Sequence, residues 1–85
     1  MLPMQVKEMI EDGLPNAIVE VHSEDGSHFE AIVVSEAFTN LSMVKQHQAV
    51  YALLDDAIKM NAIHALALKT YTPESWEKAK KSQLA

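Results

Sequence analysis

Residues 17–34 read AIVEVHSEDGSHFEAIVV, two runs rich in β-branched residues around a central Ser-Glu-Asp-Gly-Ser. Runs of this kind form strands, so residues 17–22 and 28–34 are predicted to make a hairpin. A glycine in the short connection can take the left-handed conformation that closes such a turn, and we assign this role to Gly26. Because side chains alternate along a strand, one face of the hairpin is apolar. The other face presents Glu20, His22, His28 and Glu30.

A long amphipathic helix is predicted downstream of this hairpin. Ser42 has the character of a helix cap, and Asn61 tolerates the left-handed conformation that ends a helix. Between them, apolar residues recur at the spacing of one helical face, which indicates that this face covers the sheet. The predicted stripe contains Val44, His47, Tyr51, Leu54 and Ile58, and is widened by Met43, Val50, Leu53 and Ala57.

Residues 63–71, IHALALKTY, predict a third strand. A connection from one strand through a helix to a neighbouring strand is right-handed and makes the two strands parallel. Parallel strands begin at the same end of a sheet. His64, near the start of the third strand, is therefore expected at the hairpin-loop end, close to His22 or His28.

The remaining elements complete a single domain that occupies residues 1–85. A first helix is predicted over residues 3–12, and a short helical turn follows Ser35. Thr72 caps a last helix that begins with proline and runs to about Lys80. The order is α-β-β-(short α)-α-β-α. We therefore predict an α+β fold with a three-stranded mixed sheet and helices packed on one face.

Composition narrows the functional classes. In 85 residues, 48% are hydrophobic and 22% charged, which is typical of a globular domain. No apolar run approaches the roughly 20 residues that cross a bilayer, and the N-terminus lacks a signal-peptide pattern, so a cytoplasmic location without membrane attachment is expected. No catalytic fingerprint is present, so we predict that the chain is not an enzyme. The chain has no cysteine, which excludes disulfides and its own thiolate ligands.

Histidines are the remaining soft ligands. The predicted register pairs Val21 with Phe29 and makes His22 and His28 direct cross-strand neighbours, at a separation that suits a shared metal. The alternative is a solvated sheet face on which these side chains serve solubility. For His64, which lies in an otherwise apolar stretch, the alternative is a core histidine bonded to a carbonyl oxygen.

Nucleic-acid binding is a competing hypothesis. Lys45 and His47, near the start of the main helix, are its candidate contacts, although packing is the simpler interpretation of His47. The net charge is -5, and all seven basic residues are Lys, whereas Arg makes the bidentate contacts that read guanine. Composition therefore weighs against sequence-specific DNA recognition.

Three stretches together resemble a known family. They are GSHFEAIVVS at residues 26–35, FTNLSMVKQHQAVYALL at residues 38–54 and IHALALKTYTPESW at residues 63–76. This pattern resembles the BolA family, in its short YrbA/IbaG-type branch, over essentially residues 3–80. The resemblance implies a class II KH-like fold, which agrees with the element order predicted above.

The resemblance also implies a function. It implies partnership with monothiol CGFS glutaredoxins, in which a bridging 2Fe-2S cluster is held by the glutaredoxin cysteine, glutathione and the BolA-type chain, for cluster trafficking or iron homeostasis. The family's C-terminal histidine corresponds to His64. The family's loop ligand corresponds to Asp25, where a carboxylate would be unusual, so the second ligand is open among His28, His22 and Asp25, in that order.

Three roles remain to be distinguished at this point. The first is a cluster partner that holds no cofactor when isolated and exists alone as a monomer or weak homodimer. The second is a DNA-binding transcriptional regulator, which some family members are described to be; this chain lacks a GxxG phosphate-clamping loop. The third is an adaptor that binds glutaredoxin without holding the cluster. In that case the His64→Ala variant would still form the complex with glutaredoxin that contains no cluster.

Overall fold

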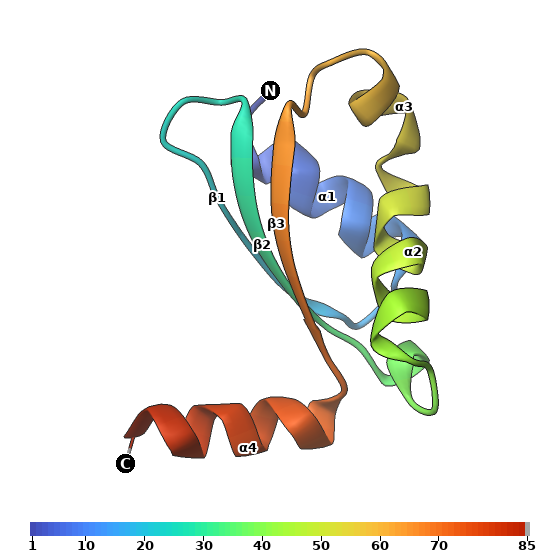
Figure 1. The fold of residues 1–85 in the computed structure, drawn as a ribbon, viewed down its shortest axis with the longest axis vertical. Coiled ribbons are helices and arrows are strands. Elements are labelled where there is room, and N and C mark those ends of the chain that lie inside the picture. Colours follow the sequence, from blue (N-terminus) through green and yellow to red (C-terminus); the bar gives the residue numbers. More distant parts are fainter. Residues whose placement is uncertain (85) are drawn as a thin grey trace.

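The computed structural model describes residues 1–84, and its elements follow the predicted order (Figure 1). The α+β fold class is therefore confirmed. The elements, in chain order, are α1 (Pro3–Gly13), β1 (Ile18–His22), β2 (His28–Val34), the 3-10 turn η1 (Glu36–Phe38), α2 (Met43–Leu53), α3 (Asp55–Lys59), β3 (Ala65–Tyr71) and α4 (Pro73–Leu84).

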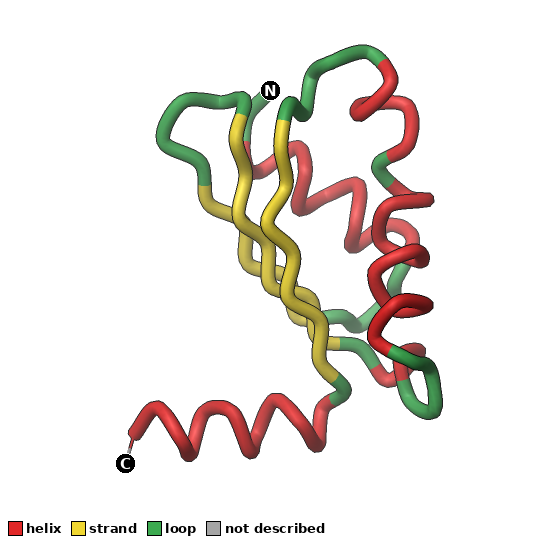
Figure 2. The backbone as a smooth tube through the Cα atoms, viewed as in Figure 1, coloured by secondary structure: helices red, strands yellow, loops and turns green. Residues whose placement is uncertain are grey.

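The sheet has the order β1-β2-β3. β1 and β2 are antiparallel, whereas β2 and β3 are parallel, with His28 opposite Ala65. The predicted crossover through the helical region is thus confirmed. As a result, the starts of β2 and β3 lie side by side at one end of the sheet (Figure 2).

The predicted register of the hairpin is wrong by two residues. Val21 lies opposite Ala31 rather than Phe29, and His22 lies opposite Glu30, so His22 and His28 are not direct cross-strand neighbours. Because the displacement is an even number of residues, every side chain keeps its predicted face.

Side chains in the hairpin loop explain the displacement. The Ser23 hydroxyl donates to the backbone oxygen of His28 at 2.7 Å and accepts from the N–H of Gly26 at 2.9 Å. The backbone oxygen of His28 is thus bound by a side chain, whereas in the predicted register its partner would be a backbone N–H group of the opposite strand. Gly26 has a φ of 74°, the left-handed conformation that the sequence predicts for it.

The core lies between the sheet and the layer formed by α1, α2 and α3. Helix α1 packs mainly on β1, and α2 packs on β3 and α1. Apolar side chains from both sides meet there, as the alternation of the hairpin predicts. The fully or almost fully buried members are Val6, Ile10, Val19, Phe29, Val33, Phe38, Val50, Leu54, Ala57 and Ile63.

The main helix presents a different stripe from the predicted one. Val44 is 65% exposed and Tyr51 is 38% exposed, so these two residues do not face the core. Gln46 is buried instead, because its side chain donates to the backbone oxygen of Leu41 at 3.0 Å and accepts from the Thr70 hydroxyl at 2.8 Å. A polar residue with buried partners thus lies on the same face of the helical region as Val50 and Ala57, among apolar residues.

The ends of several elements also differ from the predictions. The predicted main helix is interrupted at Leu54, which separates α2 from α3. The third strand begins at Ala65, because the N–H of Ile63 donates to the backbone oxygen of Ala57 and stays in the turn after α3. Asn61 has a φ of 59°, as expected for the residue that ends this helical region.

The predicted helix caps are confirmed. The Ser35 and Ser42 hydroxyls accept backbone N–H groups at the starts of η1 and α2. At the start of α4, the Thr72 hydroxyl accepts the N–H of Ser75 at 3.1 Å, and the Ser75 hydroxyl accepts the N–H of Thr72 at 2.9 Å. These reciprocal bonds satisfy groups that the helix itself cannot pair.

Helix α4 stands apart from the other helices. It leaves the end of β3 and extends away from α1 and α2 (Figure 1). Its contact with the sheet is made through Trp76, whose ring centre lies 5.2 Å from that of Tyr71. Most other residues of α4 are polar, so this helix has little apolar surface to bury. The single helical layer predicted from the sequence therefore consists of α1, α2 and α3.

Candidate functional site

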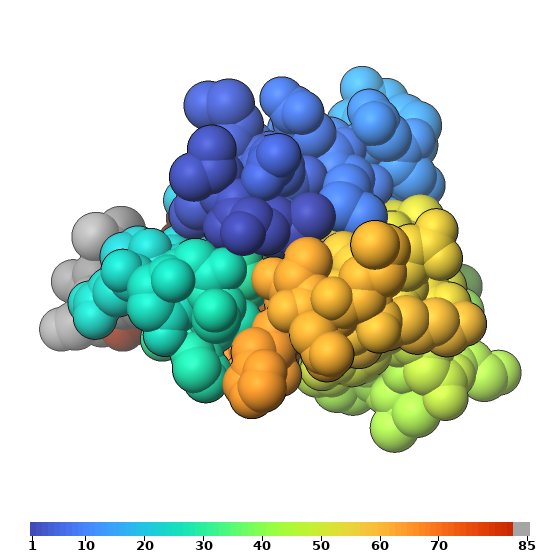
Figure 3. Space-filling view, turned by 90° about the horizontal axis from the view of Figure 1, so that it is seen from above, coloured from blue at the N-terminus to red at the C-terminus, as the bar shows by residue number. Residues whose placement is uncertain are grey.

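The hairpin loop and the start of β3 adjoin at one end of the sheet, beside the N-terminal residues (Figure 3). The backbone oxygen of Ser27 accepts the N–H of His64 at 2.8 Å and that of Ala65 at 3.3 Å. These bonds attach the segment that enters β3 directly to the loop. Residues that are distant in the sequence are thereby held next to each other.

His28 and His64 are in contact at this end. Their ring centres are 5.5 Å apart and the rings are inclined by 65°, an edge-to-face arrangement. The predicted convergence of His64 with a hairpin histidine is confirmed, and the histidine is His28. This geometry lies within the ordinary range of an edge-to-face ring pair.

Both imidazoles are accessible to solvent. His64 is exposed, and the side chain of His28 is 61% exposed. The alternative prediction of a core histidine at position 64 is therefore wrong. Exposure matters because a ring nitrogen can bind a group from another molecule only where that group can approach it.

His22 lies apart from this pair. Its nearest charged neighbour is Glu24, at 3.9 Å between Nε2 and the carboxylate oxygen, and its side chain is 66% exposed. It lines a shallow hollow together with Asp25, His28 and Glu30. His22 is thus near the site, but the described partner of its side chain is the carboxylate of Glu24.

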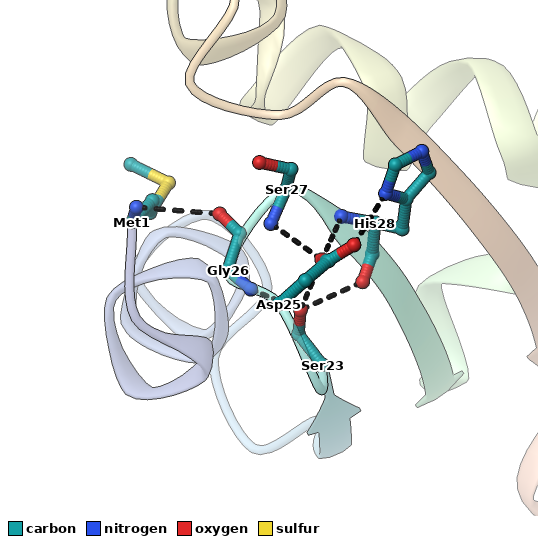
Figure 4. A network of polar contacts seen from close by, with 6 residues as sticks. All are labelled: Met1, Ser23, Asp25, Gly26, Ser27 and His28. Carbon is teal, nitrogen blue, oxygen red and sulfur yellow. Dashed lines mark hydrogen bonds and ion pairs between the residues drawn. The ribbon is translucent and has the colours of Figure 1, made fainter.

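Asp25 organises the loop that carries His28 (Figure 4). One carboxylate oxygen accepts the N–H groups of Ser27 and His28, each at 2.8 Å, and the other lies 2.7 Å from Nδ1 of His28. The backbone N–H groups of His28 and Ser27, followed by the His28 side chain, hold the pKa of Asp25 well below its usual range. The carboxylate therefore stays ionised at neutral pH.

The donor set of the site is incomplete for a metal held by this chain alone. Within residues 1–84, no three His, Cys, Asp or Glu side chains gather in a way that could hold a metal ion. Two neighbouring imidazoles with open access suit a metal centre whose other ligands come from another molecule. Imidazole is an established ligand of 2Fe-2S clusters, so the residues fit such a shared cluster.

The two residues proposed for nucleic-acid contact lie on α2. Lys45 is exposed in the first turn of this helix. His47 is half-buried, and its Nε2 atom is enclosed without a hydrogen-bond partner among the described residues. The two side chains therefore do not form an exposed basic pair.

Sequence reasoning missed the contact between Asp25 and His28. It considered Asp25 only as a possible ligand, whereas the structure directs this carboxylate to the neighbouring histidine. The signal was present in the order Asp-Gly-Ser-His, because Asp side chains characteristically bond backbone groups two or three residues further on.

Comparison with known proteins identifies the family. The model of the BolA-like protein family matches residues 6–75. The chain belongs to the BolA family. Among characterised members, this BolA-family chain is similar to the acid stress protein IbaG of Escherichia coli K12, with 47% identity over 75 residues, 85% of this chain and 89% of IbaG. The resemblance to the IbaG-type branch is thereby confirmed.

Two further relatives are a BolA homologue of known structure and a BolA protein named as a DNA-binding regulator. The structure of a BolA homologue from Coxiella burnetii is 37% identical and superposes with a TM-score of 0.79, covering 91% of this chain and 97% of that one. The DNA-binding transcriptional regulator BolA of E. coli K12 is 32% identical over an alignment of 87 positions, which covers 87% of this chain and 82% of the regulator.

Within the described residues, no helix of this BolA-family chain has the length and apolar character needed to cross a membrane.

Proposed function

We propose that this BolA-family protein completes a 2Fe-2S cluster through His64 and His28, with the other ligands supplied by a monothiol CGFS glutaredoxin and glutathione, in cluster trafficking or iron homeostasis. The observation that carries the proposal is the pair of accessible imidazoles 5.5 Å apart, in a chain without cysteine. A domain that has no thiolate of its own can still supply the histidine ligands of a shared cluster.

His28 is the preferred second ligand. It lies against His64, whereas His22 lies opposite Glu30 and near Glu24. Asp25 is a poorer candidate, because its carboxylate oxygens are already engaged by the loop backbone and by His28. A carboxylate ligand would also be unusual for a cluster of this kind.

The test is anaerobic reconstitution with a CGFS glutaredoxin, glutathione, iron and sulfide, followed by visible absorbance and circular dichroism. Wild type is expected to give a heterodimer whose spectrum differs from that of the glutaredoxin homodimer. His64→Ala and His28→Ala are expected to lose this spectrum. His22→Ala is the matched control, because it removes an exposed histidine from the same end of the sheet, and it should retain the wild-type spectrum.

The variants also separate cluster ligation from simple docking. If His64→Ala still gives the wild-type mixed spectrum, ligation by His64 is refuted. If wild type binds the glutaredoxin but leaves the spectrum of its cluster unchanged, the chain is an adaptor and the ligation hypothesis is refuted. If wild type neither alters the glutaredoxin cluster nor comigrates with the protein, the glutaredoxin partnership itself is refuted.

DNA binding is the second candidate, favoured by the name of the E. coli regulator that matches 87% of this chain. Exposed Lys45 and the half-buried His47 are its candidate contacts. The net charge of -5 opposes it. Titration of the protein with DNA and with the glutaredoxin at 50 and 200 mM salt distinguishes DNA binding from cluster partnership. Phosphate contacts produce a steep loss of affinity with added salt, whereas cluster ligation does not.

A further inference from the structure

Hydrogen bonds from the loop backbone orient the carboxylate of Asp25 toward the side chain of His28. One of its oxygens is bound by the backbone N–H groups of Ser27 and His28, each at 2.8 Å. The second oxygen is thereby directed to Nδ1 of His28, at 2.7 Å (Figure 4). The orientation of the carboxylate is thus set by the loop backbone, and the orientation of the ring follows from it.

This contact selects one form of the neutral imidazole. A neutral imidazole has one N–H group, and its other nitrogen has a lone pair. Because an ionised carboxylate only accepts hydrogen bonds, Nδ1 must hold the proton for this contact to be favourable. Nε2 then presents its lone pair on the side of the ring that points away from Asp25, and a metal binds only a nitrogen that has no proton.

We infer that Asp25 is a positioning residue, which holds the proton of His28 on Nδ1 and the ring in place, so that Nε2 is the atom that binds iron. The iron-binding part of this inference rests on the function proposed above, whereas the position of the proton does not. A carboxylate that accepts the second N–H of a metal-bound imidazole is a common outer-shell arrangement, and it also strengthens the imidazole as a ligand.

The two histidines therefore have different roles in the site. The side chain of His28 has a fixed carboxylate partner, whereas that of His64 has no hydrogen bond in the part of the chain that the structure describes. His28 is preorganised, and His64 keeps its freedom to adjust. A partner's cluster would thus meet one oriented ligand and one adaptable ligand.

The substitution Asp25→Asn tests the inference with little change of shape. The asparagine carbonyl can still accept the N–H groups of Ser27 and His28, whereas its NH₂ group now faces Nδ1 as a donor. The favoured proton position on His28 therefore moves to Nε2. Glu24→Gln is the matched control, because it makes the same change of charge one residue away, at a side chain that is 91% exposed.

The first measurement is the ¹⁵N chemical shift of each ring nitrogen in the isolated, labelled protein at pH 8. Wild type and Glu24→Gln are expected to show His28 with its proton on Nδ1, and Asp25→Asn to show it on Nε2. The amide shifts of Ser27 and His28 verify that the loop is retained. A wild-type ring protonated mainly on Nε2 would overturn the inference whatever the variant does, as would an unchanged proton position in an Asp25→Asn chain with an intact loop.

The second measurement is reconstitution of the mixed cluster with glutaredoxin. Asp25→Asn is expected to weaken retention of the cluster by about 10- to 100-fold, the usual effect of losing such an outer-shell partner, whereas Glu24→Gln is unchanged. Equal retention by Asp25→Asn and wild type would overturn the assignment of Nε2. If wild type has its proton on Nδ1 but forms no mixed cluster, the proposed function fails while the orientation of His28 by Asp25 stands.

Discussion

Replacing Thr70 with valine tests the buried polar link between α2 and β3. The Thr70 hydroxyl donates to Oε1 of Gln46 at 2.8 Å, and the two residues are only 3% and 8% exposed. Valine has nearly the same shape but cannot donate, so the Gln46 oxygen is left without its partner. An unpaired buried acceptor of this kind costs about 1–3 kcal/mol, and the added methyl group offsets about 0.8 kcal/mol of that loss at most.

Taking the middle of the resulting range, we expect Thr70→Val to lower the free energy of unfolding by about 1–2 kcal/mol, out of a total of about 5–10 kcal/mol for a domain of this size. The corresponding fall in Tm is about 4–16 °C. Urea unfolding followed by far-ultraviolet circular dichroism measures this effect, with the slope m unchanged.

Thr39→Val is the matched control, because Thr39 is exposed. It should stay within about 0.5 kcal/mol of wild type. If Thr70→Val also lies within 0.5 kcal/mol of wild type at the same slope, the Thr70–Gln46 hydrogen bond does not contribute as argued.

Three other outcomes are expected. Phe38 is fully buried, so Phe38→Ala should cost about 3–5 kcal/mol in urea unfolding, and a loss below 1 kcal/mol would contradict its place in the core. Asn40 has a φ of 67°, a left-handed conformation that alanine adopts only with strain. The free energy of unfolding of Asn40→Ala should therefore be about 1–2 kcal/mol lower than that of Asn40→Gly, as measured by urea unfolding. Equal urea midpoints for the two variants would show that this conformation is not strained. The N–H groups of His28 and Ser27 lower the pKa of Asp25 from 3.8, so its hold on the loop persists above pH 4 and is lost as the pH falls further. The NMR shifts of the amide groups of these two residues should stay constant from pH 7 to pH 4. A titration midpoint of these shifts at or above pH 4 would contradict a lowered pKa of Asp25.

The approach of His64 to a hairpin histidine was predictable from the sequence because it depends on topology, whereas the choice of His28 over His22 was not. A helical crossover between neighbouring strands makes them parallel, so the starts of β2 and β3 lie at the same end of the sheet regardless of the details of the helices. The apolar face of the hairpin was equally predictable, since an even displacement of the register leaves Phe29 on the core face. These features follow from periodicity and from the order of strands and helices, which the sequence expresses directly.

The parts that were not predictable depend on individual polar contacts. The hairpin register depends on the Ser23 hydroxyl, which takes the place of a backbone partner for His28. The buried face of α2 depends on Gln46, whose burial is possible only because Thr70 and Leu41 supply its hydrogen-bond partners. Hydrophobic periodicity counts only apolar residues, so it contains no information about where a hydrogen-bond partner for either polar side chain will be.

The bonds from the Ser27 oxygen to the segment that enters β3 have a thermodynamic consequence. By linking Ser27 to His64 and Ala65, they keep the rings of His28 and His64 together although these two residues are 36 positions apart in the sequence. The pair of rings therefore exists in the folded chain and is dispersed in the unfolded one. A ligand that requires both rings therefore binds the native state alone. By mass action, such a ligand at 100 times its Kd would add about 2.7 kcal/mol to the free energy of unfolding, so that occupancy of the site would be measurable as a rise in melting temperature.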